Sequence, residues 1–203
     1  MNYRVQIFID FWNFVLSLKG ENGGVGFPSD WEKIPHVFIR EAMNVISPGN
    51  PGIYQGMNVY GSYDPASPSD VKLHKWARNT LDTFAGTNVY FVQRQKKKRG
   101  PKCPSCHTVV ERCPVCGNNM RGTEEKGVDT LIATDMIRLA WEDNYDVAIL
   151  VSADRDFIPV ANFLQIKALK VIHGAFPPLG AELTQKCWGS FQIPSVCGEF
   201  KIT

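Results

Sequence analysis

Short apolar runs alternate with longer amphipathic stretches along most of the chain. The runs are rich in Val, Ile, Phe and Tyr, as is typical of strands buried inside a parallel sheet. They predict five strands, over residues 4–10, 57–62, 88–93, 146–152 and 169–173. This alternation is typical of an α/β fold in which helices cover the sheet.

Apolar residues at helical spacing fill the gaps between the runs. One predicted helix has a clear start, because Ser67 can cap it, Pro68 suits the first helical position and Asp70 completes a capping-box spacing. The predicted helices cover residues 30–46, 71–84, 128–141, 156–166 and 179–187, and a short apolar tail follows at 191–193.

Residues 95–123 show neither strand nor helix periodicity, and they interrupt the alternation of strands and helices. A chain of 203 residues suits one domain with a small insertion. We therefore predict one domain built from residues 1–94 and 124–203, with residues 95–123 as an inserted basic arm and ribbon.

The composition excludes several classes of protein. With 44% hydrophobic and 21% charged residues, the chain is neither disordered, nor collagen-like, nor a coiled coil. Apolar runs such as residues 147–151 fall far short of the ~20 residues of a membrane span, so we expect no membrane partner. Residues 1–9 lack the pattern of a signal peptide, so a cytoplasmic protein is expected.

The net charge of +2 conceals an uneven distribution. Six of the 22 basic residues lie within nine positions that contain no acidic residue. The rest of the chain has 16 basic and 20 acidic residues, so its net charge is −4. The six are Arg94, Lys96, Lys97, Lys98, Arg99 and Lys102. Such a run favours a nucleic-acid-binding arm, and a solvated linker or a localisation-like basic run is the alternative.

Four of the six cysteines form two C-x-x-C pairs, Cys103 with Cys106 and Cys113 with Cys116. Two thiolates at this spacing can face one point, and the glycine after Cys116 suits a tight knuckle. A disulfide or a redox site is the alternative, but two pairs so close together favour one structural Zn²⁺.

Aspartates follow two of the predicted strands. Asp10 ends the first strand, and Asp154 and Asp156 follow the fourth. In an open α/β sheet, ligands bind outside the carboxyl ends of the strands, where the strand order reverses. If the order is 3-2-1-4-5, Asp10 and Asp154 face the same crevice.

The helix predicted after the insert carries two more aspartates. Asp129 lies in its first turn, where the helix dipole favours an anion. Asp135 lies on the apolar stripe, ~9 Å deeper along the helix. A hydrogen-bonded structural role suits Asp135 slightly better than a role at a metal.

Crowded carboxylates either take up protons or hold a cation. Oxygen ligands suit Mg²⁺ or Mn²⁺, which can activate water and neutralise charge on a phosphate. Asn13 can orient such a water or phosphate, or cap a helix. Ser152 and Lys126 can contact the phosphate, or serve as a turn residue and a solvated lysine, respectively.

Together these motifs resemble the NYN family of PIN-like nucleases, also called the LabA-like group. The matching residues are Asp10 with Asn13, then Lys126, Asp129 and Asp135 in a helix opened by K-G-V-D, then Ser152, Asp154 and Asp156 in S-A-D-R-D-F. The resemblance implies a three-layer α/β/α sandwich with a mostly parallel five-stranded sheet. It also implies a ribonuclease site with Mg²⁺ or Mn²⁺ at Asp10, Asp129, Asp154 and Asp156.

The main hypothesis is thus a divalent-metal-dependent endoribonuclease that cleaves single-stranded or structured RNA. Two alternatives stay open: a non-catalytic RNA-binding or scaffold protein with the same fold, and a structure-specific DNA nuclease. The acids on all three motifs disfavour the binder, because a protein that only binds polyanions gains by losing them.

Overall fold

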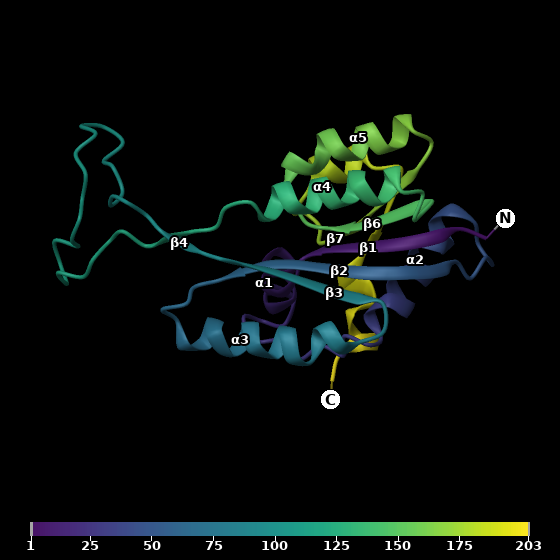
Figure 1. The fold of residues 1–203 in the computed structure, drawn as a ribbon, viewed down its shortest axis with the longest axis horizontal. Coiled ribbons are helices and arrows are strands. Elements are labelled where there is room, and N and C mark those ends of the chain that lie inside the picture. The colour runs from purple at the N-terminus through teal and green to yellow at the C-terminus, as the bar shows by residue number, and fades with distance from the viewer. Residues whose placement is uncertain (1, 203) are drawn as a thin grey trace.

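Six parallel strands form the centre of the molecule. The computed structural model describes residues 2–202, and Figure 1 shows its fold. The strands are β1 (Arg4–Asp10), β2 (Ile53–Tyr63), β3 (Thr87–Gln93), β6 (Val147–Val151), β7 (Lys170–Ala175) and β8 (Gly189–Gln192). They lie in the order β3-β2-β1-β6-β7-β8, and every neighbouring pair is parallel.

The five strands predicted from the sequence are present, in the order 3-2-1-4-5. The expectation of a five-stranded sheet was wrong by one strand, because β8 pairs with β7 at the edge. Residues 191–193 were expected to be a simple apolar tail. Only Phe191 is buried within β8, so this strand carries no alternation that identifies it in the sequence.

Helices cover both faces of the sheet and give the expected three layers. One face packs on α1 (Phe11–Glu21), α2 (Ile34–Ile46) and α3 (Pro68–Asn79), and the other on α4 (Val128–Trp141), α5 (Ile158–Ile166) and α6 (Ala181–Lys186). Figure 1 shows α4 and α5 on one side of the strands and α3 on the other. No helix in the described part of the chain has the length and apolar content to cross a membrane.

Helix boundaries follow from local chemistry. The α3 helix begins as predicted, with the Ser67 hydroxyl accepting a hydrogen bond from the Asp70 N–H at 3.4 Å. The α4 helix has the predicted bounds. The α1 helix was not predicted, because it starts without any loop after β1, where Asp10 is both the last strand residue and the helix cap.

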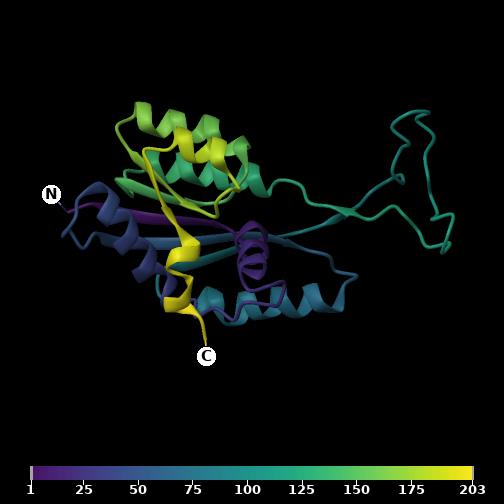
Figure 2. The ribbon, with the colours of Figure 1, turned by 180° about the vertical axis from the view of Figure 1, so that it is seen from behind.

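The C-terminal segment seals one face of the sheet. Figure 2 shows it, in yellow, crossing in front of the strands beside α2. Phe200 is fully buried there, with its ring 5.9 Å from that of Phe38 and 6.3 Å from that of Phe14. This segment therefore belongs to the core.

Residues between β3 and α4 form a ribbon that extends away from the sheet (Figure 1). Its base is an antiparallel pair, β4 (Gln95–Lys96) and β5 (Thr123–Glu124), and the Lys97 N–H donates to the Gly122 carbonyl at 3.2 Å. No residue of the ribbon belongs to either hydrophobic cluster of the described chain. Because the ribbon follows the last residue of the parallel strand β3, it leaves from the carboxyl edge of the sheet.

Candidate active site

Asp10 lies at the carboxyl end of β1, where the strand order reverses between β1 and β6. One carboxylate oxygen accepts a hydrogen bond from the Asn13 N–H at 3.2 Å, and the other accepts from the Ser152 hydroxyl at 3.1 Å. Burial raises the pKa of Asp10 to about 6, although these two hydrogen bonds oppose the shift. Asp10 is therefore held rigidly, at a point where its charge is costly.

Asn13 connects α1 to the loop after β6. Its side-chain oxygen accepts a hydrogen bond from the Ala153 N–H at 3.0 Å. The helix cap at this position is Asp10, so the capping role considered for Asn13 is wrong. Asn13 instead fixes the segment that carries Asp154.

Ser152 links Asp10 to this segment and is almost fully buried. Its hydroxyl oxygen accepts from the Asp154 N–H at 3.2 Å while it donates to Asp10. Asp154 in turn caps the next turn, with its carboxylate accepting from the Asp156 N–H at 2.9 Å. On the neighbouring strand β7, His173 Nε2 lies 2.7 Å from the Ser152 carbonyl oxygen.

Asp129 lies in the first turn of α4, after Gly127 at a positive φ of 90°. Burial raises the pKa of Asp129, and the nearby charges of Asp154, Glu125 and Asp156 raise it further. The charges of Asp129 and Glu125 also raise the pKa of Asp10. Asp129 therefore lies close enough to the other three predicted aspartates for their charges to repel it.

Glu125 is a fifth carboxylate in this group, and the sequence reasoning missed it. Its side chain accepts a hydrogen bond from the Ser62 hydroxyl at the end of β2, and Arg94 Nη2 lies 3.9 Å from its carboxylate. The only signal in the sequence is its place just before K-G-V-D, at the edge of the sheet where the other acids lie.

Arg94 belongs to the site and not to the free arm. Its Nε donates to the Ser62 hydroxyl oxygen at 2.8 Å, and its guanidinium lies 5.2 Å from the centre of the Trp12 ring. Since Arg94 precedes β4 and Glu125 follows β5, both ends of the ribbon are anchored beside the carboxylates.

Two of the other candidates have partners outside the five carboxylates. Asp135 is buried in α4, where it accepts hydrogen bonds from the Tyr60 hydroxyl at 3.0 Å and from Arg138 Nε at 3.2 Å. These contacts are those of a hydrogen-bonded structural aspartate. Lys126 pairs with Glu124 at 2.8 Å on the exposed ribbon base.

The four ribbon cysteines lie on two loops with the same backbone. The His107 N–H donates to the Cys103 carbonyl and the Gly117 N–H to the Cys113 carbonyl, both at 2.9 Å, with positive φ at the two donor residues. The Thr108 hydroxyl, 3.3 Å from Cys106 Sγ, lowers the pKa of this exposed thiol to about 7. No two of the described cysteines are joined by a disulfide.

Over residues 2–202, no three His, Cys, Asp or Glu side chains converge tightly enough to surround one ion. This holds for the cysteines and for the aspartates. The chemistry of each donor set still fits an ion: clustered carboxylates with raised pKa values suit Mg²⁺ or Mn²⁺, and paired thiols suit Zn²⁺.

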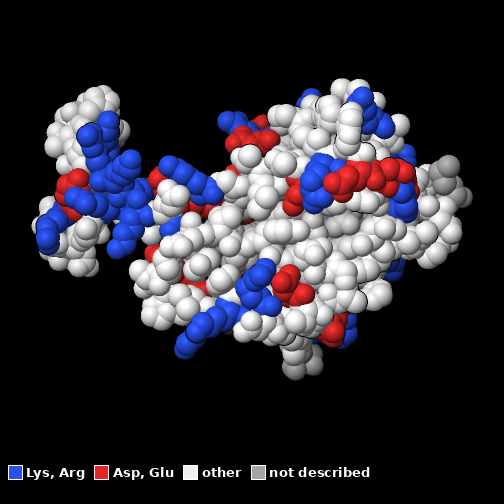
Figure 3. All heavy atoms as spheres, in the orientation of Figure 1, with Lys and Arg blue, Asp and Glu red and all other residues white. Residues whose placement is uncertain are grey.

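Basic side chains gather on the ribbon, as Figure 3 shows. Lys96, Lys97, Lys98, Arg99 and Lys102 are all exposed, and Arg112 and Arg121 lie farther along the ribbon. Arg121 is neutralised by Glu111, whereas the described ion pairs include none of the three consecutive lysines. The ribbon therefore carries a net positive charge next to the acidic site.

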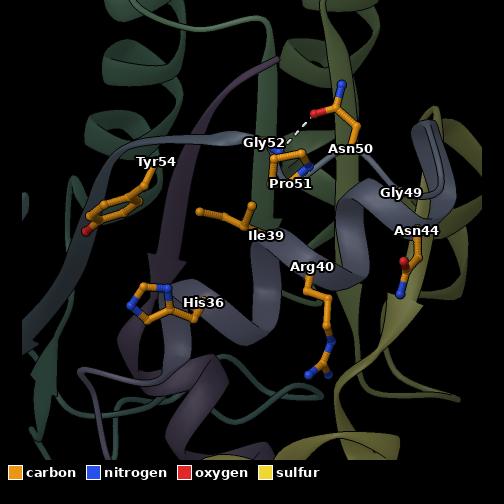
Figure 4. A pocket seen from close by; sticks show the side chains of 9 residues that line it. All are labelled: His36, Ile39, Arg40, Asn44, Gly49, Asn50, Pro51, Gly52 and Tyr54. Carbon is orange, nitrogen blue, oxygen red and sulfur yellow. Dashed lines mark hydrogen bonds between the residues drawn. The ribbon is translucent and has the colours of Figure 1, made fainter. Parts of the chain in front are cut away.

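A separate hollow of about 580 Å³ lies at the opposite edge of the sheet (Figure 4). His36 and Arg40 of α2 and Tyr54 at the start of β2 line it. Because the carboxylates lie at the other ends of the strands, this hollow is no part of the acidic site.

Comparison with solved structures shows the same fold elsewhere. A crystal structure of a protein of unknown function from Vibrio parahaemolyticus matches with a TM-score of 0.59 at 17% sequence identity, covering 99% of this chain and 97% of that one. No curated protein sequence matches. The family model described as "NYN domain" matches residues 4–191, a span that contains all five carboxylates, so the chain belongs to the NYN domain family, whose members are generally PIN-like nucleases.

Proposed function

We propose that this protein is a divalent-metal-dependent endoribonuclease. The observation that carries the proposal is the carboxylate cluster, in which half-buried Asp10 and exposed Asp129 both have raised pKa values. Desolvation is the main cause, and neighbouring carboxylates, Glu125 among them, raise both values further. Such a cluster at the carboxyl edge of a parallel sheet favours a bound cation, because the hydrogen bonds to Asp10 only partly offset the shift of its pKa.

Asp10, Asp129, Asp154 and Asp156 would hold Mg²⁺ or Mn²⁺. The ion would activate water and neutralise the charge on the phosphate under attack. Asn13 and Ser152 keep Asp154 and Asp10 in fixed relative positions through the bonds described above. In-line attack on phosphorus would leave a 5′-phosphate, as the family resemblance implies.

The ribbon would hold the substrate. Lys96, Lys97, Lys98, Arg99 and Lys102 supply exposed cations that the acidic site lacks, and phosphate contacts of this kind give affinity with little sequence preference. Arg94, at the junction, would meet the phosphates nearest the carboxylates.

Zn²⁺ would fold the ribbon through Cys103, Cys106, Cys113 and Cys116. The matching backbone of the two knuckles and the lowered pKa values of Cys106 and Cys113 support this role. Elemental analysis of protein purified without chelator tests it: we expect about one zinc per chain, and no zinc would overturn the assignment.

Cleavage of end-labelled single-stranded RNA and DNA of the same sequence tests the catalytic proposal. With Mg²⁺ or Mn²⁺, wild type should cut RNA and leave DNA uncut. Asp10→Asn and Asp154→Asn should each lower the rate at least 100-fold, while Glu32→Gln, an exposed carboxylate elsewhere, should not. Equal rates in wild type and both variants would refute the site, faster cleavage of DNA would assign a DNA nuclease, and binding without any cleavage would assign an RNA-binding protein.

A further inference from the structure

Polar side chains replace apolar ones on one part of the sheet. Strands of a parallel sheet are normally buried and apolar on both faces. On the face that carries α4, however, Gln6 of β1 and Asn58 of β2 are buried at 5% and 2% exposure, and Asn88 of β3 pairs in register with Asn58. Burying the amides of Gln6 and Asn58 is costly unless they are hydrogen-bonded, and Asn88 adds an exposed amide at the edge of this group.

The amides form one hydrogen-bonded network. Gln6 Nε2 and Asn88 Nδ2 both donate to Asn58 Oδ1, at 3.4 and 3.1 Å, and Asn58 Nδ2 donates to the Tyr60 hydroxyl at 2.9 Å. Among the described residues, neither Gln6 Oε1 nor Asn88 Oδ1 accepts a hydrogen bond. The outer amides are thus held in place, with acceptors left over.

These amides line a hollow of about 270 Å³ beside the C-terminal half of α4. Its walls include Tyr90 and Asn144, and Arg138 stands at its side. Gly56 makes room for it, because a Cβ there would lie 3.2 Å from the Gln6 amide and 2.9 Å from the Gly86 carbonyl oxygen. α4 packs on β1 and β2, which leaves the hollow in the corner beside edge strand β3.

The hollow lies toward the amino ends of the strands and the carboxylates lie at the carboxyl ends, but both are on the same face of the sheet. Along β2 this face runs from Asn58 through Tyr60 to Ser62, and Ser62 is bonded to Glu125 of the acidic cluster. The distance is ~13 Å along the strand, which a few nucleotides of an extended single strand can cover. Tyr90, stacked on Tyr60 with ring centres 5.1 Å apart, lies between.

We propose that this hollow binds a nucleobase of the substrate strand, with a preference for adenine. The proposal rests on the proposed function. An amide offers a paired acceptor and donor that match adenine N6 and N7, and a tyrosine ring offers a face for stacking. The hollow would hold one base while the carboxylates act on a phosphate a few nucleotides away.

Binding of labelled nine-nucleotide oligoadenylate and oligouridylate, measured by fluorescence anisotropy without added divalent ion, tests the proposal separately from catalysis. Wild type should bind oligoadenylate at least 10-fold more tightly. Asn88→Leu, which fills the hollow, and Asn88→Ala, which only removes the amide, should abolish the preference and leave oligouridylate affinity within twofold. Asn44→Leu, at an exposed asparagine of α2 on the other face of the sheet, is the matched control.

Equal affinity for the two oligonucleotides in wild type, or an intact preference in a folded Asn88 variant, would overturn the proposal. Binding of adenosine monophosphate to wild type and the Asn88 variants is measured as well. If it binds in an Asn88-dependent way while the oligonucleotides bind equally, the hollow serves a free nucleotide and not the strand. A preserved adenine preference together with absent cleavage would refute the proposed catalysis and leave the hollow intact.

Discussion

At the scale of single residues, each aspartate of the site is held by backbone or hydroxyl donors or placed by a helix start. Asp10 and Asp154 each accept a backbone N–H within a cap, and Ser152 joins them. These bonds fix the carboxylates but do not offset desolvation and the neighbouring negative charges, so Asp10 and Asp129 keep raised pKa values. The site is therefore under electrostatic strain in the absence of a cation.

This strain predicts a stability effect of Asp10→Asn. The pKa of Asp10 rises from 3.8 to about 6 on folding, so the folded state binds the proton more tightly and loses stability as pH rises from about 4 to 6. Without divalent ions, Asp10→Asn should raise the free energy of unfolding at pH 7.5 by about 1–3 kcal/mol.

Urea unfolding at pH 4 and pH 7.5 measures this effect. The gain should be much smaller at pH 4, where Asp10 is protonated in the folded state and partly protonated in the unfolded state. Glu32→Gln, an exposed carboxylate outside the cluster, serves as the control. Destabilisation by Asp10→Asn at pH 7.5 would contradict the account.

The same shift predicts how ion binding depends on pH. Below about pH 6, Asp10 is protonated and its oxygens are poor ligands, so affinity for Mn²⁺ should fall steeply between pH 7 and pH 5. Calorimetric titration of the protein with Mn²⁺ at several pH values measures this affinity. A pH-independent affinity would separate Asp10 from the ion.

The sequence predicted Asp10, Asp129 and Asp154 as neighbours, because strand ends in a parallel sheet share one edge. It did not predict Glu125 or the role of Arg94. Their contacts through Ser62 depend on how the ribbon leaves the sheet, and periodicity says nothing about that. The amide hollow was missed for a similar reason, since Gln6, Asn58 and Asn88 come from three separate strands.

At the scale of elements, strong periodicity predicted structure well. The α4 helix has its predicted bounds, and the five longer strands appear in the predicted order. Two elements were not predicted. The α1 helix follows β1 without a break, and β8 is a four-residue edge strand containing one buried side chain. Such elements are set by tertiary packing, which a local pattern does not report.

The ribbon is an element whose contribution to binding can be measured. Replacing Lys96, Lys97 and Lys98 with Gln should weaken RNA binding and make the slope of log affinity against log salt shallower by about 2, because each phosphate contact contributes about 0.7 for a single strand. Anisotropy titrations between 50 and 300 mM NaCl measure it. Lys19, Lys33 and Lys72 replaced together are a matched control on the domain, and an unchanged slope in the ribbon variant would remove the lysines from the interface.

At the scale of the whole molecule, the sheet is closed on one face by the C-terminal segment. Phe200 is fully buried among Phe14, Phe27 and Phe38. Phe200→Ala should lower the free energy of unfolding by about 3–5 kcal/mol, through lost burial and the cavity left behind. Ile202→Ala, at an exposed side chain two residues away, should change it by less than about 0.5 kcal/mol. Urea unfolding compares the two, and equal effects would show that the segment is not part of the core.

The molecule as a whole combines a carboxylate cluster, a basic ribbon that leaves beside it, and a polar hollow on the same sheet face. We propose that the carboxylates cut RNA with the help of a divalent ion. The most direct test is the single-turnover cleavage rate of labelled single-stranded RNA across a Mn²⁺ titration, for wild type and Asp129→Asn. We predict a wild-type rate that rises with Mn²⁺ to a plateau and is zero without it, and a plateau at least 100-fold lower in Asp129→Asn. A rate that ignores Mn²⁺, or the same plateau in both proteins, would contradict the claim.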